Sequence, residues 1–74
     1  MEQKILVTVV TGRAEHEGQR ILEVAEGSTI EEVVRRLNLL PDECIVMRNS
    51  VPVPLTEELH DKDLIRIIRV ASGG

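Results

Sequence analysis

Short hydrophobic runs and one helical repeat organise this chain. Runs rich in β-branched residues, each too short for a typical helix, predict strands at residues 4–10, 20–24, 43–48 and 64–70. A further short strand is expected around Pro52, and it should lie at a sheet edge because proline cannot donate to a ladder. Residues 11–19 contain two glycines and should connect the first two strands as a hairpin. Residues 56–63 are polar and are expected to be irregular, with at most one helical turn.

Between the second and third strands, the apolar spacing changes to that of an α-helix. One helical face carries the residues at i, i+3, i+4 and i+7, which are Ile30, Val33, Val34 and Leu37. Ser28 or Thr29 should be the N-cap, and one of the glutamates that follow should complete a capping box. The helix is expected to end around residues 38–40, because Pro41 restricts the residue before it and cannot continue the hydrogen bonding.

The order of elements is therefore β-β-α-β-β-β. One helix lying across a mixed sheet of four to five strands buries the helical face most economically, so the fold class is α+β. Residues 1–70 should form a single domain, with Asn49 and Ser50 in a tight turn before the fourth strand. Residues 71–74 should follow as a flexible tail.

Composition narrows the function classes. The 74 residues contain no Phe, Tyr or Trp, so the core must consist of Ile, Leu and Val, and no aromatic platform exists for a nucleic-acid base. The net charge of −4 argues against a phosphate-backbone partner. No apolar run approaches the roughly 20 residues that span a bilayer. Cys44 is the one cysteine, so we expect no internal disulfide. Taken together, these features lead us to expect a monomer in the cytoplasm that binds neither nucleic acid nor a membrane directly.

Two glycines, Gly73 and Gly74, stand at the end of the sequence, directly behind the last apolar run. Glycine has no Cβ, so such a tail can extend into a channel that is too narrow for other residues. Its terminal carboxylate is the candidate reactive group. Two such glycines also occur by chance in about one chain in 200, so the tail alone is only suggestive.

Several motifs together resemble the ubiquitin-like β-grasp family. They are the helix start Gly-Ser-Thr-Ile-Glu-Glu-Val, the Asn-Ser turn followed by Val-Pro-Val-Pro, the His-Asp-Lys-Asp turn before the last strand, and the final Ser-Gly-Gly. The resemblance covers the whole chain. Within the family, the chain resembles the prokaryotic sulfur carriers more than ubiquitin; these are the thiamine sulfur carrier, the small subunit of molybdopterin synthase and the ubiquitin-related modifier. The resemblance is greatest to the small archaeal modifier proteins.

That resemblance implies a carried substrate that is not an enzyme. A ubiquitin-activating-type enzyme would use ATP to adenylate Gly74. Gly73 would let Gly74 extend to the site of that reaction. Attack by sulfur would give a thiocarboxylate for tRNA thiolation or for thiamine or molybdopterin biosynthesis, whereas attack by a lysine amine of a target protein would give an isopeptide bond. The chain itself would bind no cofactor or metal, and the sequence contains no phosphate loop or paired cysteines. The sequence does not decide which acceptor is used.

An activating enzyme also needs a surface on which to dock. In the last strand, Ile65 and Ile67 point to one side and the alternate residues to the other. If the first pair packs under the helix, the opposite face carries an apolar docking patch, formed by Ile45, Met47, Arg66, Ile68 and Val70 and rimmed by Arg48 and Arg69. Two alternatives remain. The last strand has the opposite phase in one, and other parts of the chain cover the patch in the other.

Other chemically active side chains have simpler interpretations. Cys44 begins an apolar strand and is expected to be a small buried hydrophobic residue rather than a nucleophile. His16 and His60 are expected to be solvated loop residues. Whether Lys4 or Lys62 could accept a second copy of the chain stays open. A second class of function also remains, a β-grasp module that only docks partners through its sheet face and never forms the bond at Gly74.

Overall fold

The computed structural model describes residues 3–12 and 18–70. Five strands form one mixed sheet in the order β2-β1-β5-β3-β4, in which β1 and β5 are parallel and the other neighbours antiparallel. The elements are β1 (Lys4–Thr11), β2 (Gln19–Ala25), α1 (Ile30–Arg36), a 3-10 helix (Pro41–Glu43), β3 (Cys44–Arg48), β4 (Val51–Val53) and β5 (Leu64–Arg69). This is the predicted β-grasp fold, with predicted strand bounds correct to within one residue.

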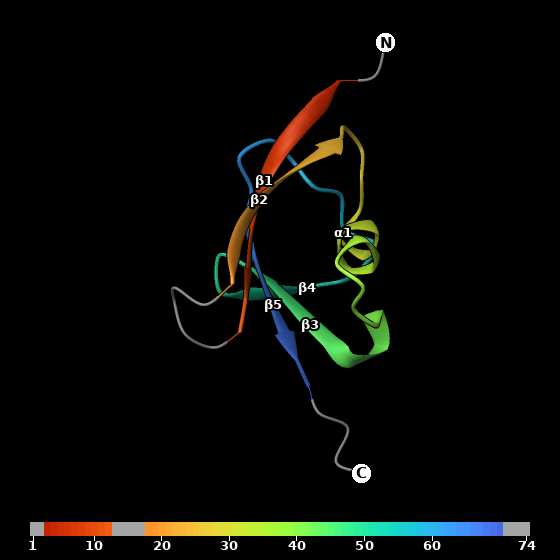
Figure 1. The fold of residues 1–74 in the computed structure, drawn as a ribbon, viewed down its shortest axis with the longest axis vertical. Helices are drawn as coiled ribbons and strands as arrows, with labels where there is room; N and C mark the ends of the chain where they lie inside the picture. Colours follow the sequence, from red (N-terminus) through yellow and green to blue (C-terminus); the bar gives the residue numbers. More distant parts are fainter. Residues whose placement is uncertain (1–2, 13–17, 71–74) are drawn as a thin grey trace.

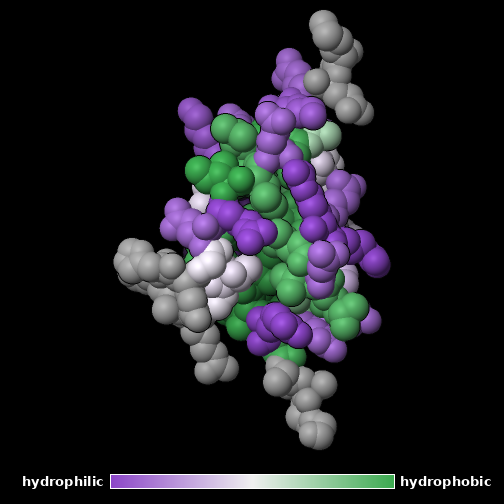
Figure 2. Space-filling view, in the orientation of Figure 1, coloured by the Kyte–Doolittle hydropathy of each residue, from purple (hydrophilic) through white to green (hydrophobic). Residues whose placement is uncertain are grey.

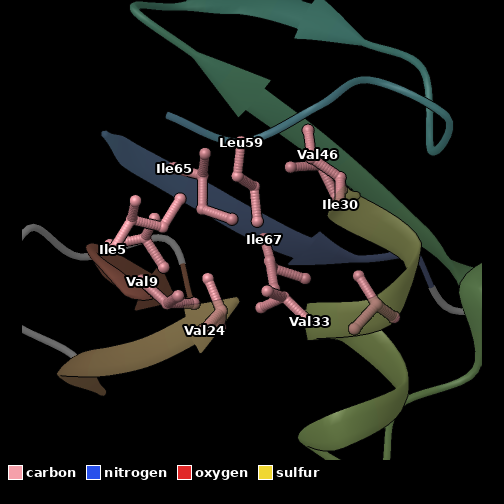
Figure 3. Packing of buried hydrophobic residues seen from close by; sticks show 11 residues of the cluster. Ile5, Val9, Val24, Ile30, Val33, Val46, Leu59, Ile65 and Ile67 are labelled. Carbon is pink, nitrogen blue, oxygen red and sulfur yellow. The ribbon is translucent and has the colours of Figure 1, made fainter. Parts of the chain in front are cut away.

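A single hydrophobic core lies between α1 and one face of the sheet (Figure 1). Figure 3 shows side chains from β1, β2, β3 and β5 converging with those of the helix. The most completely buried members are aliphatic, as the composition requires, and are Ile30, Leu59, Ile65, Ile67, Val7, Val9, Val33, Val34 and Val46. The predicted inward face of the helix is therefore confirmed, although Leu37 is only partly buried.

The helix begins and ends differently from the prediction. Thr29 is the N-cap, but its side chain makes no capping hydrogen bond, so the predicted capping box is wrong. Instead, the N–H groups of Ile30 and Glu31 donate to backbone carbonyls in the segment that follows β4. At the other end Asn38 adopts a φ of 62°, and the chain leaves the helix two residues earlier than expected.

That early end is a Schellman motif. The N–H of Leu39 donates to the carbonyl of Val34 at 3.1 Å, and the N–H of Asn38 donates to that of Arg35 at 2.9 Å. These two bonds satisfy carbonyls that the helix end would otherwise leave without partners. Asparagine tolerates the left-handed conformation that the motif requires, so Asn38 stops the helix before Pro41 can.

The segment between β4 and β5 is more ordered than its polar sequence suggested. Leu59 is fully buried in the core, which the sequence analysis missed. The Arg48 guanidinium holds this segment against β3, with Nη1 2.9 Å from Glu57 Oε2 and Nη2 2.7 Å from Asp63 Oδ2. Nη2 also donates to the carbonyl of Glu58 at 2.8 Å. None of the helices in the described residues is long and apolar enough to cross a membrane.

We predict that Arg48→Met lowers the free energy of unfolding by about 2 kcal/mol, because it leaves half-buried carboxylates without their cation. Arg35→Met is the matched control, since Arg35 pairs with Glu31 on the exposed helix surface. The free energy of unfolding of Arg35→Met should fall by less than about 0.5 kcal/mol. Urea unfolding of both variants measures the difference, and equal losses would mean that Arg48 does not hold the segment.

Candidate functional site

The two faces of β5 have different surroundings. Ile65 and Ile67 are 0% and 1% exposed under the helix, which confirms the predicted strand phase. Ile67 stands opposite Val46 of β3, another core residue. Because side chains alternate along a strand, Arg66 and Ile68 lie on the other face of the sheet, which the helix does not cover.

The predicted docking residues are brought together on that open face. Ile45 stands opposite Ile68, and Met47 stands opposite Arg66, in the antiparallel pairing of β3 with β5. Ile45 is 46% exposed and Val70, just after β5, is 45% exposed. Met47, Arg66 and Ile68 are partly buried. The five residues thus form a half-exposed, mainly apolar surface.

Further apolar residues extend this surface across the sheet. Leu6 of β1, Ile21 of β2 and Leu64 of β5 are all at least half exposed. Their register partners place all three on the open face: Thr8 pairs with both Ile21 and Leu64. Figure 2, in the orientation of Figure 1 with α1 beside the sheet, shows hydrophobic side chains along the middle of the visible side and hydrophilic ones on its flanks, but does not look directly onto the open face. The alternation of residues 4–10 would have revealed Leu6, but the sequence analysis did not use it.

The arginine rim differs from its prediction. Arg48 was expected beside the patch, but its side chain is largely buried on the helix side of the sheet in ion pairs with Glu57 and Asp63. That expectation was wrong, because Arg48 pairs with Ile65 in the sheet and therefore shares its face. Arg66 donates to the carbonyl of Gly12 at 3.2 Å. Its guanidinium is thereby held close to the open face.

The end of β5 is anchored as far as the last residue that the structure describes. The N–H of Val70 donates to the carbonyl of Glu43 at 2.8 Å, and Arg69 Nη2 lies 3.9 Å from Glu43 Oε1. Gly73 and Gly74, the expected reactive residues, lie outside the described residues. The structure therefore shows how the chain is held up to Val70, the residue before the predicted tail.

Other candidate groups show no catalytic arrangement in the part of the chain that is described. Cys44 is half buried against the core, and this partial burial raises the pKa of its thiol, which disfavours the nucleophilic thiolate. His60 is an exposed turn residue, as expected, and His16 lies outside the described residues. Within residues 3–12 and 18–70, no group of three His, Cys, Asp or Glu side chains is placed to hold a metal ion.

A family comparison decides which of the ubiquitin-like folds this chain has. The model of the ThiS family matches residues 7–74, nearly the whole sequence and both glycines at its end. The chain belongs to the ThiS family. It is thus a member of a family of small ubiquitin-like sulfur carriers, which are not themselves enzymes. Among curated proteins, none matches the sequence significantly.

Solved structures agree with a ThiS-family fold. A ubiquitin of Caldiarchaeum subterraneum has 21% identity and a TM-score of 0.73, over 97% of this chain and all of that one. A putative molybdopterin converting factor, subunit 1, from Pyrococcus furiosus has 15% identity and a TM-score of 0.71, over 90% and 99%. SAMP1 from Haloferax volcanii has 17% identity and a TM-score of 0.68, over 93% and 99%. At these identities, the likeness supports the fold alone.

The two faces of β5 predict opposite results for the same substitution. Ile68→Asp should leave the thermal unfolding midpoint nearly unchanged, since its charge can reach water on the open face. Ile67→Asp should unfold the domain, because it buries an unpaired carboxylate beneath the helix. Thermal unfolding followed by circular dichroism measures both. A stable Ile67→Asp protein would contradict the assigned faces.

Proposed function

We propose that this ThiS-family protein is a carrier whose C-terminal glycine, Gly74, is adenylated by an activating enzyme and then takes up sulfur or joins a target lysine. The observation that carries the proposal is the family match, which runs through the strand β5 and on to Gly74. The fold supports it, because the strand that precedes the tail is central in the sheet and anchored to its end.

The chemistry explains why an enzyme and ATP are needed. A carboxylate is a poor acylating agent, because its carbonyl carbon is electron-rich and its leaving group would be oxide. Attack of the Gly74 carboxylate on the α-phosphorus of ATP releases pyrophosphate and gives an acyl adenylate, whose leaving group is AMP. In this proposal ATP is bound by the activating enzyme and not by the carrier, and the pair works in the cytoplasm.

Two outcomes follow from the adenylate. Attack by a persulfide sulfur displaces AMP and, after reductive cleavage of the sulfur–sulfur bond by a thiol, leaves a C-terminal thiocarboxylate, which is a sulfur donor for tRNA thiolation or for thiamine or molybdopterin biosynthesis. Attack by a lysine amine, directly or through an enzyme thioester, gives an isopeptide bond and releases the proton to solvent. The partner enzymes would choose between these acceptors, and Lys4 and Lys62 are candidate acceptors for a second copy.

The open face of the sheet is the proposed docking surface. Ile45, Met47 and Ile68 would supply apolar contacts, Val70 would extend them towards the tail, and Arg66 would meet an acidic or carbonyl group of the partner. The same surface also suits the alternative function, a module that docks without forming a bond. Chemistry at Gly74 separates the two functions.

An extra alanine after Gly74 should abolish the formation of the acyl adenylate, because the reacting carboxylate would no longer fit where glycine is required. ATP–pyrophosphate exchange catalysed by the cognate activating enzyme should fall to background. An extra alanine at the N-terminus is the matched control and should leave exchange unchanged. If both extended proteins support exchange equally, the reaction does not involve Gly74 and the docking module gains support.

Docking can be tested separately from the reaction. Ile68→Asp should weaken binding of the activating enzyme by at least about 30-fold, since buried apolar anchors commonly contribute about 2 kcal/mol or more. Val51→Asp is the control, because it places the same charge on an exposed apolar residue that pairs with Arg48 and belongs to the other side of the sheet. Titration calorimetry measures both affinities. Equal weakening would show that the open face is not the docking surface.

A further inference from the structure

The sheet has two edges, and they are protected differently. β4 is three residues long and contains Pro52, two features that discourage another strand from pairing with it. β2 at the opposite edge has seven residues and no proline. In the part of the chain that the structure describes, no strand pairs with the outer side of β2. An uncovered edge of this length can accept an extended peptide as an added strand.

The hydrogen bonds to β1 show which groups of β2 point outward. Thr11 donates to the carbonyl of Gly18 at 3.4 Å, and Glu26 donates to that of Gln3 at 2.8 Å. In an antiparallel pair, bonded positions alternate, so every second residue between these two points turns its N–H and C=O inward. The residues with outward groups are Gln19, Ile21, Glu23 and Ala25.

Two of these four residues already use their outward carbonyls. Arg36 Nη1 donates to the carbonyl of Glu23 at 2.6 Å, and the N–H of Ser28 donates to that of Ala25 at 3.1 Å. Gln19 and Ile21 make no comparable bond with any described residue. The open length of the edge is therefore the segment from Gln19 to Ile21, with Arg36 limiting it at one end.

The side chains on this segment argue against a second copy of the chain. If two copies paired symmetrically and antiparallel through this segment, Gln19 of one copy would lie opposite Ile21 of the other. Arg20 would then lie opposite Arg20. Like charges directly opposite each other destabilise a ladder. Arg20 is exposed, and its N–H and C=O point inward to β1, so it would form a non-hydrogen-bonded pair with the opposite residue of an added strand. Opposing side chains lie closest in such pairs.

We propose that the edge of β2 binds an extended segment of a partner protein with an acidic residue opposite Arg20 and β-branched apolar residues on both sides of it. Gln19 and Ile21 would each exchange two main-chain hydrogen bonds with the segment. The carboxylate would meet Arg20 on the helix side of the sheet, and an apolar side chain would cover Ile21, which is 66% exposed on the open face. This non-covalent site is separate from the reaction proposed at Gly74.

The probe is the acetylated and amidated peptide Thr-Thr-Val-Glu-Val-Thr-Thr, titrated into the full-length, isotope-labelled protein. We expect chemical-shift changes at the amides of Gln19 and Ile21. The same peptide with lysine in place of glutamate should bind at least about threefold more weakly, as expected for a cross-strand charge pair. Shifts confined to other strands, or none at about millimolar peptide, would overturn the proposal.

Variants of β2 test the mode of binding. Ile21→Pro removes an outward N–H that the sheet does not use and should abolish binding, whereas Ile21→Thr keeps that N–H and should retain binding. Arg20→Glu should reverse the preference between the two peptides, and this test holds even if Ile21→Pro does not fold. An unchanged preference would overturn the proposal. Self-association in sedimentation that Arg20→Thr strengthens, by removing the like charges that would lie opposite each other, would also overturn it, in favour of a second copy.

Discussion

The rest of the structure depends on the burial of one face of β5. This strand lies in the middle of the sheet, with β1 on one side and β3 on the other, and Ile65 and Ile67 are closed off beneath α1. Since side chains alternate along a strand, burying these two residues forces Arg66 and Ile68 onto the uncovered face. The same pairing holds the chain in place up to Val70, just before its final residues. One packing constraint thus fixes the core, the candidate docking surface and the point from which the tail begins.

The aliphatic core also explains how so small a domain carries an apolar outer face. A chain of this length buries only about 60% of its unfolded surface, and its core here contains no aromatic residue. Stability therefore relies on local supports such as the Schellman motif at Asn38 and the ion pairs of Arg48. With those supports on the helix side, residues such as Ile45 are not needed for the core and remain available to a partner. An exposed apolar surface of this kind commonly marks an interaction site.

Periodicity predicted most of the fold, because burial of one face follows directly from spacing. The helical face of Ile30, Val33 and Val34 and the two faces of β5 were correct for this reason. The features that failed depend on contacts between distant segments. The helix start is capped by the loop after β4, Arg48 finds its partners nine and fifteen residues away, and Leu59 is an apolar residue in a polar stretch. The residues predicted for docking lie on one face because this follows from strand phase, and their role in docking stays a prediction. The reactive role of Gly73 and Gly74, inferred from the tail and from the family resemblance, also stays a prediction.

Mass spectrometry of the protein recovered from its own cells tests the central claim most directly. Fragmentation of the intact chain should locate a sulfur atom in place of an oxygen at Gly74. If protein conjugation prevails, tryptic digestion should instead leave a Val-Ala-Ser-Gly-Gly branch on target lysines, because Arg69 is the last cleavage site in the sequence. A chain that carries an unmodified Gly74 and forms no such branch, or that carries its sulfur on Cys44, would contradict the account.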